Sequence, residues 1–170
     1  MNPPPDSRTD SRTNTLQTPL LARLREFLGR YHGQGVNHAG EAFRADFLFD
    51  DALDGNLVEL RFRASDADHS FHDERTWITE DLMTQQIAMW TISSNTPGVL
   101  RLELIEDSSD SSYLLFLTFR LGDPDDDSRF RQQIQIGLRR DQAIEYIYSW
   151  GVPHEPFGVK SKVLLKRTQT

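Results

Sequence analysis

The stretch FLGRYHGQG, residues 27–35, decides the fold, because an apolar helical pattern ends in it and a glycine-bearing strand begins in it. Gly29 stands directly after the last apolar residue of the helical pattern, where glycine commonly ends a helix. Tyr31, Gly33 and Gly35 then recur at every second position, and glycine inside a strand marks a bend or a close approach of another backbone. The pattern predicts a bent first strand.

A single short helix is expected before this strand. Thr18 supplies a side-chain oxygen at the N-cap position, and Pro19 follows it at the first helical position. Apolar residues then recur at spacings of three and four, which predicts an amphipathic helix over residues 18–28. Residues 1–16 carry one leucine among prolines and polar side chains, so we expect them to form a disordered tail.

Downstream of the helix, the sequence alternates between apolar and polar residues. Residues 43–49 place phenylalanine or alanine at every odd position, and residues 58–64 place an apolar residue at every even position. Groups of turn residues recur along the rest of the chain and divide it into ten strands. The nine predicted turns are 37–40, 50–55, 65–68, 80–82, 93–98, 107–112, 122–128, 139–141 and 151–156.

This organisation predicts an all-β fold, an antiparallel meander β-barrel of about ten strands with one short N-terminal capping helix. No long helical pattern interrupts the strands, which excludes parallel βαβ units. Closure removes the exposed edges that an open sheet would leave. We expect residues 17–168 to form this single domain, with an internal cavity that holds a small molecule.

Composition and charge narrow the range of partners. The 170 residues carry a formal net charge of -7, which argues against nucleic acid, since phosphate contacts need clustered Lys and Arg. The chain has no cysteine, so disulfides and thiolate chemistry are excluded. The N-terminal residues lack the apolar core of a signal peptide, and no run is apolar enough for a membrane span. We expect a cytoplasmic protein.

Three segments resemble the calycins, the barrels that include lipocalins and fatty-acid-binding proteins, and within them the nitrobindin branch. They are residues 28–35, similar to the Gly-x-Trp-x-Gly-x-Gly opening of that branch, residues 71–77, similar to its His-x-Glu strand, and residues 144–150 with 159–167, similar to its last hairpin. The resemblance implies a calycin-like barrel in which Tyr31, at the tryptophan position, plugs one end. It implies ligand binding in a lipocalin-like cavity or, in the nitrobindin branch, haem binding.

Two departures from the nitrobindin pattern bear on haem. The Tyr-Pro-Thr-Ile segment that follows the glycines in that branch is replaced here by residues 36–40, VNHAG. The haem-binding histidine that opens the last strand in nitrobindins is replaced by Val159 or Lys160, and the nearest histidine is His154. Haem ligation therefore does not transfer residue by residue. We expect no cofactor, and haem remains an alternative.

Aromatic residues are the main candidates for ligand binding. Tyr146, Tyr148 and Trp150 share one strand face, and Trp77 and Trp90 lie on strands in the middle of the chain. Rings with one polar atom suit a cavity because they combine apolar area with a hydrogen bond that orients the ligand. The alternative interpretation is ordinary barrel packing or an outward aromatic patch.

Arg75 and His154 complete the candidate site. Arg75 would hold a ligand carboxylate if it points inward, whereas an ion pair with Asp73 on the solvent face is the simpler alternative. His154 lies in a proline-flanked loop at the barrel rim, where it would ligate haem or act as an acid-base group; a solvated loop histidine is the alternative. His69 and His72 lie three residues apart and face opposite sides of a strand, which argues against a metal site.

These observations predict binding and assign no catalytic residue. No phosphate-binding loop, nucleophile elbow or Ser/His/Asp set stands in a recognisable context. The leading hypothesis is non-covalent binding of a small hydrophobic or amphipathic molecule in the cavity. One alternative is a haem-binding or small-molecule-converting enzyme that uses the same cavity, with His154 or His72 as its central group. Another is an interaction module whose outer face contacts a different protein, and a homodimer is also compatible with the sequence.

Overall fold

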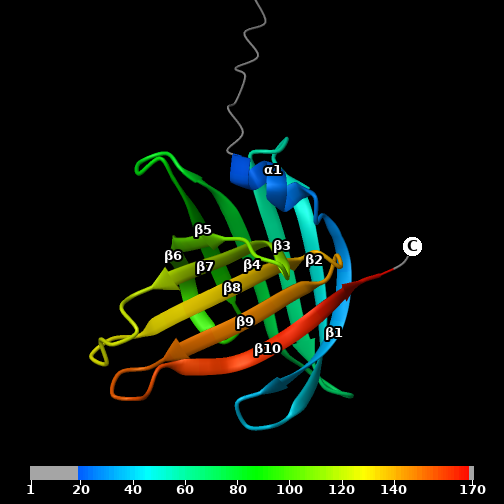
Figure 1. The fold of residues 1–170 in the computed structure, drawn as a ribbon. Helices are drawn as coiled ribbons and strands as arrows, with labels where there is room; N and C mark the ends of the chain where they lie inside the picture. Colours follow the sequence, from blue (N-terminus) through cyan, green and yellow to red (C-terminus); the bar gives the residue numbers. More distant parts are fainter. Residues whose placement is uncertain (1–18, 169–170) are drawn as a thin grey trace, which may run out of the picture.

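The computed structural model describes residues 19–168, which contain a closed barrel of ten antiparallel strands with one short helix against one end (Figure 1). The helix is α1 (Pro19–Arg25). The strands are β1 (Gly29–Asn37), β2 (Ala42–Ala52), β3 (Leu57–Ser65), β4 (Ser70–Asp81), β5 (Gln86–Ser93), β6 (Thr96–Ser108), β7 (Tyr113–Leu121), β8 (Arg131–Arg139), β9 (Ile144–Gly151) and β10 (Gly158–Arg167). The predicted ten-stranded meander barrel is confirmed. The predicted tail, residues 1–16, lies outside the described residues.

The barrel is a meander that closes on itself. Each strand pairs antiparallel with the next strand of the chain, and β1 closes the barrel by pairing with both β2 and β10. Tyr31, for example, lies opposite Phe47 on one side and Arg167 on the other. Every strand therefore has two neighbours, and the barrel leaves no sheet edge open for pairing with another chain.

The glycines of β1 allow its neighbours to come close. A Cβ atom on Gly33 would lie 2.3 Å from the backbone oxygen of Leu164 in β10. A Cβ atom on Gly35 would lie 2.4 Å from the ring of Phe43 and 2.8 Å from the backbone oxygen of Lys162. The close approach expected from the sequence is present at both positions, and it is what lets β1 join β2 to β10.

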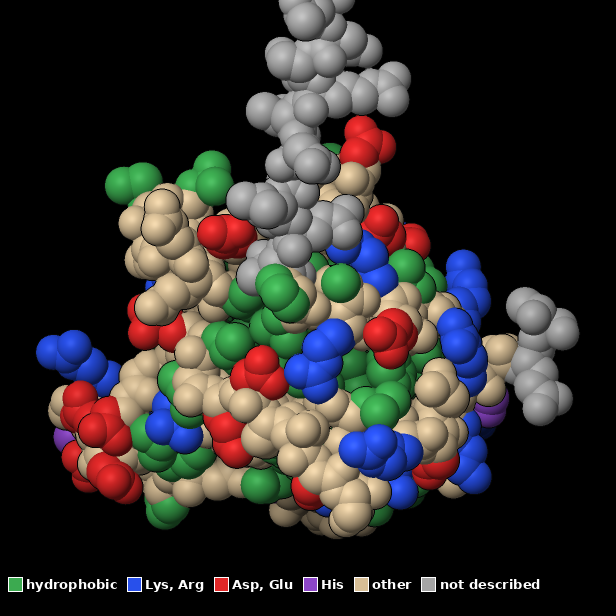
Figure 2. Space-filling view, turned by 45° about the horizontal axis from the view of Figure 1, so that its top comes forward, with side chains coloured by type: hydrophobic (Ala, Val, Ile, Leu, Met, Phe, Trp, Pro, Cys, Tyr) green, Lys and Arg blue, Asp and Glu red, His purple; other side chains and the backbone are tan. Residues whose placement is uncertain are grey.

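Helix α1 covers one end of the barrel (Figure 1). The buried side of the helix carries Leu20, Leu21 and Leu24. Figure 2 shows this end of the molecule, where hydrophobic side chains gather among scattered acidic and basic ones. The α-helix ends at Arg25 rather than at residue 28, because residues 26–28 continue as a tighter turn with hydrogen bonds to residues three positions earlier. Gly29 follows with a φ of 148°, which glycine adopts readily.

The interior side chains alternate along β2 and β3 as the sequence pattern predicts. On β2 and β3 the inward residues are all buried, and they are Phe43, Ala45, Phe47, Phe49, Val58, Leu60, Phe62 and Ala64. Near α1 the interior is filled by such apolar side chains. Toward the other end it contains a group of polar side chains from β4, β5 and β9. This polar group and the space beside it form the candidate site.

Candidate functional site

A cavity of about 180 Å³ opens beside residues of the β1–β2 hairpin. This hairpin turns at the end of the barrel away from α1 (Figure 1). Six aromatic side chains supply most of the cavity wall, and they are Phe43, Phe62, Phe71, Tyr146, Tyr148 and Trp150. The polar residues around it are Asn37, His38, His72, Asn95, Lys160 and Ser161. Among residues 19–168, no Asp or Glu belongs to this lining, and Lys160 is the one Lys or Arg on the wall.

The aromatic wall is held by ring contacts. The rings of Phe62 and Tyr146 stack with their centroids 5.1 Å apart, and the ring of Tyr148 lies 6.0 Å from that of His72. At the mouth, the ammonium of Lys160 sits 4.5 Å from the ring centroid of Trp150, a cation–π geometry. Packed rings of this kind lose little freedom when a ligand binds, so the cavity is largely preformed.

A buried hydrogen-bonded cluster stands behind the wall. Glu74 is only 4% exposed, and its Oε1 accepts hydrogen bonds from the Tyr146 hydroxyl at 2.5 Å and from Thr76 Oγ1 at 3.0 Å. Thr76 Oγ1 lies 2.9 Å from Thr91 Oγ1, and Glu74 Oε2 lies 3.5 Å from His72 Nε2. These partners satisfy a carboxylate that would be costly to bury alone. The cluster also fixes the orientation of the Tyr146 hydroxyl and of the His72 ring.

The two tyrosines of the wall are held in the neutral form. Burial raises the pKa of Tyr146 well above its ordinary value, and the negative charge of Glu74 raises it further. Burial and the charge of Glu74 also raise the pKa of Tyr148, while a hydrogen bond with Thr96 opposes the shift. Both phenols therefore remain protonated near neutral pH. They supply fixed hydroxyl groups beside apolar ring surface.

Tyr31 lies at the capped end and not beside the cavity. Its ring is buried 6.4 Å from that of Phe47, and its hydroxyl donates a 2.7 Å hydrogen bond to the backbone oxygen of Phe27. Burial raises its pKa, which the charge of Arg167 partly offsets. Tyr31 thus ties β1 to the segment that follows α1, at the position where the resemblance to calycins places a plug.

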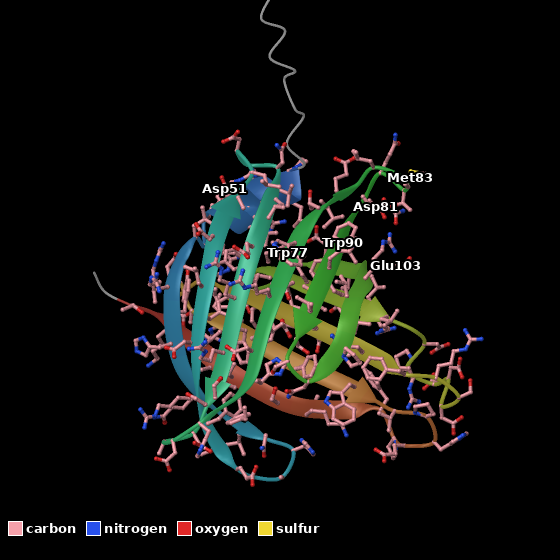
Figure 3. All side chains as sticks on the ribbon, turned by 180° about the vertical axis from the view of Figure 1, so that it is seen from behind. Asp51, Trp77, Asp81, Met83, Trp90 and Glu103 are labelled. Atoms are coloured by element: carbon pink, nitrogen blue, oxygen red, sulfur yellow. The ribbon has the colours of Figure 1, made fainter. Side chains whose placement is uncertain are left out.

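Trp77 and Trp90 lie on the outer face of the barrel (Figure 3), and Arg75 lies on the same side of β4 as Trp77. Successive side chains of a strand alternate between faces, so the burial of Glu74 and Thr76 directs Arg75 and Trp77 outward. Arg75 therefore does not reach the cavity. The alternative pair with Asp73 is not formed either, because Asp73 makes a 2.7 Å ion pair with Arg63.

His154 lies in the β9–β10 loop with its side chain exposed, outside the cavity. Its backbone has a φ of 64°, and its N–H donates a 2.7 Å hydrogen bond to the backbone oxygen of Asp127 in the β7–β8 loop. Of the seven residues expected to bind a ligand, only Tyr146 and Tyr148 line the cavity, with Trp150 beside them from the same predicted face.

Sequence reasoning considered His72 only as the central group of the haem-binding or enzyme alternative, and it did not assign Glu74 or Lys160, although all three belong to the candidate site. On β4 the inner face carries His72, Glu74 and Thr76, whereas the outer face carries Trp77, so hydrophobicity alone favours the opposite orientation. The signal that was present is Ile78, which lies on the His72 side and pairs with the buried Val58 of β3. For Lys160 no signal exists, because a bulge between Val159 and Ser161 resets the alternation of β10.

Haem does not fit this cavity. Pockets for drug-sized ligands span roughly 300–1,000 Å³, and a macrocycle of that size class exceeds a space of about 180 Å³. Among residues 19–168, no group of three or more His, Cys, Asp or Glu side chains could hold a metal ion. No helix within this described part is long and apolar enough to cross a membrane.

Comparisons of this chain with protein-family models and with curated proteins find no match. The closed ten-stranded antiparallel barrel is compatible with a calycin-like fold. The site must therefore be interpreted from its own residues, since fold alone does not determine function.

Proposed function

We propose that this protein binds, without covalent chemistry, a small amphipathic molecule with one flat apolar ring and one acidic group. The observation that carries the proposal is the cavity itself, with six aromatic side chains, a lysine at its mouth and no carboxylate in its lining. The calycin-like barrel supports it, because such barrels enclose cavities at this strand number. We also propose that the protein is lipocalin-like, because it would hold its ligand inside the barrel.

The size of the cavity limits the ligand. A water molecule in the liquid takes up about 30 Å³, so about 180 Å³ corresponds to a handful of waters and to a molecule with a single ring. The ring would lie against Phe62 and Tyr146, whose own rings already stack. Tyr148 and His72 would then offer hydrogen bonds that orient it.

Lys160 takes the role that Arg75 was expected to play. Its ammonium sits at the mouth over Trp150, beside His38, whose ring lies 6.1 Å from that of Trp150. At the mouth, a carboxylate stays partly in water. It therefore keeps much of its hydration while it pairs with this cation. An acidic group at the mouth and an apolar ring inside therefore match the distribution of polarity along the cavity.

The test is a calorimetric titration with benzoate as an acidic one-ring probe and benzamide as its neutral counterpart. We expect benzoate to bind more tightly than benzamide. Lys160→Met should remove this preference. We expect it to weaken benzoate binding about tenfold, which corresponds to about 1.4 kcal/mol of binding free energy. Lys166→Met, on the exposed outer face of β10, is the matched control and should change neither affinity.

Two results would contradict the proposal. One is that neither probe binds and that native mass spectrometry of protein purified from its host finds no small molecule released on denaturation. The other is that benzoate binds equally well to wild type, Lys160→Met and a cavity-blocking Ala64→Phe variant, which would place the binding outside the cavity.

A second candidate function is proton transfer on the bound molecule. The observation that favours it is the 3.5 Å approach of His72 Nε2 to Glu74 Oε2 at the cavity wall, an arrangement in which a carboxylate orients an imidazole for acid-base chemistry. Incubation with a small-molecule extract of the host should then convert one compound, and His72→Gln should stop the conversion without unfolding the protein. An extract whose composition is the same with wild type and with His72→Gln would exclude this function.

A further inference from the structure

The outer face of β4–β6 carries an exposed apolar surface that ligand binding does not explain. Trp77 and Trp90 lie directly opposite each other on β4 and β5, and a hollow of about 510 Å³ beside them is also lined by Leu82, Met83 and Val99 (Figure 3). We call these five residues the tryptophan face. Met83 is 92% exposed and Leu82 is 87% exposed. Contiguous exposed apolar surface of this kind marks an interaction site.

Exposed apolar side chains concentrate in this part of the barrel. Ten large hydrophobic residues of the described chain are exposed, and five of them lie on β5, β6 or the β4–β5 turn. These five are Leu82, Met83, Ile92, Val99 and Ile105. The other five lie on β1, β4, β10 and the β2–β3 turn, and Leu82, Met83 and Val99 of the first five belong to the tryptophan face.

Acidic side chains flank one end of the tryptophan face. Asp81 and Glu103 both pair with Arg101, at 2.8 Å and 2.9 Å, and Arg101 also lies over the ring of Trp90. Glu80 borders the same end. Asp81 and Glu103 thus share one guanidinium and Glu80 adds a third carboxylate, so this end of the face is negative.

Arginines flank the other end. Arg75 is exposed, lies next to Trp77 on the outer side of β4 and faces Arg61 across the β3–β4 pair. Arg61 is paired with Glu59, whereas no ion pair is formed by Arg75 with any described residue. The face therefore has a negative end, an apolar centre and a positive end.

We propose that the tryptophan face binds a second copy of this chain. When two such faces pack with their strand directions reversed, about a two-fold axis that runs across the strands, the acidic end of each copy meets the arginine end of the other. The two tryptophan pairs then meet at the centre, and both contacts are the same by symmetry, as in an isologous dimer. The other in-plane axis, along the strands, would set like charges against each other.

The shapes of the two ends agree with this arrangement. The β4–β5 turn, with Leu82 and Met83 at its tip, projects beyond the acidic end (Figure 1). Beside Arg75 lies a hollow of about 710 Å³ that extends over the outer face of β1–β5, and Ile92 and Leu48 line it among mostly charged and polar residues. Reversal of the strand direction brings the projecting tip of one copy to the hollow side of the other.

The first test is sedimentation velocity of the full chain over a range of concentrations, with two lysine substitutions as a matched pair. Val99 is 57% exposed on the tryptophan face, and Val159 is 59% exposed on β10. We expect a concentration-dependent dimer in wild type and in Val159→Lys, and a monomer in Val99→Lys. A monomer at every wild-type concentration, or an equal effect of the two lysines, would overturn the proposal and leave the face to a different partner.

Charge reversal tests the orientation. Arg75→Glu and Glu103→Arg should each weaken the dimer about tenfold or more, because each places like charges at both symmetric contacts. An equal mixture of the two variants should recover the wild-type association, since both contacts of the mixed dimer are again between opposite charges. A mixture that associates no better than either variant alone would overturn the proposed packing. Circular dichroism of each variant confirms that it is folded.

Discussion

The two ends of the barrel are built from the same strands but are filled differently. At the capped end, Phe47 and Phe49 of β2 pack beneath α1 with Tyr31, whose hydroxyl bonds to backbone. At the open end, Phe43 of the same strand lines the cavity. The β4 strand shows the same change, from Ile78 to Glu74. The barrel is therefore polarised along its axis: one end supplies packing, and the other supplies space and hydrogen bonds.

The largest predicted change in stability comes from the loss of packing between α1 and the barrel. Leu24 has no exposed surface, and its replacement by alanine should lower the free energy of unfolding by about 2–5 kcal/mol, since it removes apolar contacts and leaves a cavity. Chemical denaturation measures the change. Ala22→Ser, on the exposed side of the same helix, should stay within about 0.5 kcal/mol of wild type.

Equal stability of these two variants would show that the capped end does not depend on α1. Benzoate binding provides the second readout. If packing and binding are separated along the axis as proposed, Leu24→Ala should leave the affinity of the folded protein unchanged.

The second prediction concerns the contact of β1 with β10, which closes the barrel between its two ends. In Gly33→Ala the new methyl group would collide with the backbone oxygen of Leu164 at 2.3 Å, and the strain should cost about 3 kcal/mol. Gly158→Ala is the matched control in β10, because a Cβ atom there meets nothing within 4 Å. It should be neutral or slightly stabilising, since alanine restricts the unfolded chain. Thermal melts of the two variants that coincide would refute the close approach.

The third prediction compares the two tyrosine hydroxyls that bond at opposite ends. Tyr146→Phe removes a donor from the buried carboxylate of Glu74 and should cost about 2 kcal/mol. Tyr31→Phe removes a donor from the neutral backbone oxygen of Phe27 and should cost about 1 kcal/mol. Denaturant titrations of both variants, with equal m-values, measure the difference. A Tyr31→Phe cost larger than that of Tyr146→Phe would contradict a charged network at the open end.

The fold was largely predictable because its signals are local. Alternation on residues 43–49 and 58–64 predicted which side chains of β2 and β3 enter the core, and the turn residues predicted the number of strands. The end of α1 was predicted less accurately. Phe27 is still buried, although the α-helical hydrogen bonds have already been replaced by those of a tighter turn. A helical apolar pattern continues through such a turn and does not reveal it.

The residues around the cavity were predictable only where apolar alternation also marks the inner face of the strand. On β9 the apolar Ile144 shares a face with Tyr146 and Tyr148, so those two residues were assigned correctly to a common face. On β4 burial and hydrophobicity conflict, because the inner face carries Glu74 and the solvent face carries Trp77. Only the pairing of Ile78 with Val58 resolves the orientation, and pairing is a long-range property that one strand does not show.

The smallest effect concerns pH and separates the cavity tyrosines from the rest of the fold. Burial raises the pKa of Tyr148 above its ordinary value of 10, so above pH 10 the unfolded chain loses this proton while the folded chain keeps it. The unfolded state then binds fewer protons, and stability falls as pH rises. Tyr148→Phe removes this contribution, so its stability relative to wild type should increase by about 1 kcal/mol between pH 10 and pH 11, because the unfolded tyrosine is only partly ionised in this range. Below pH 9 the difference should be constant, and parallel curves up to pH 11 would mean that the phenol ionises in the folded cavity, which would then be open to water.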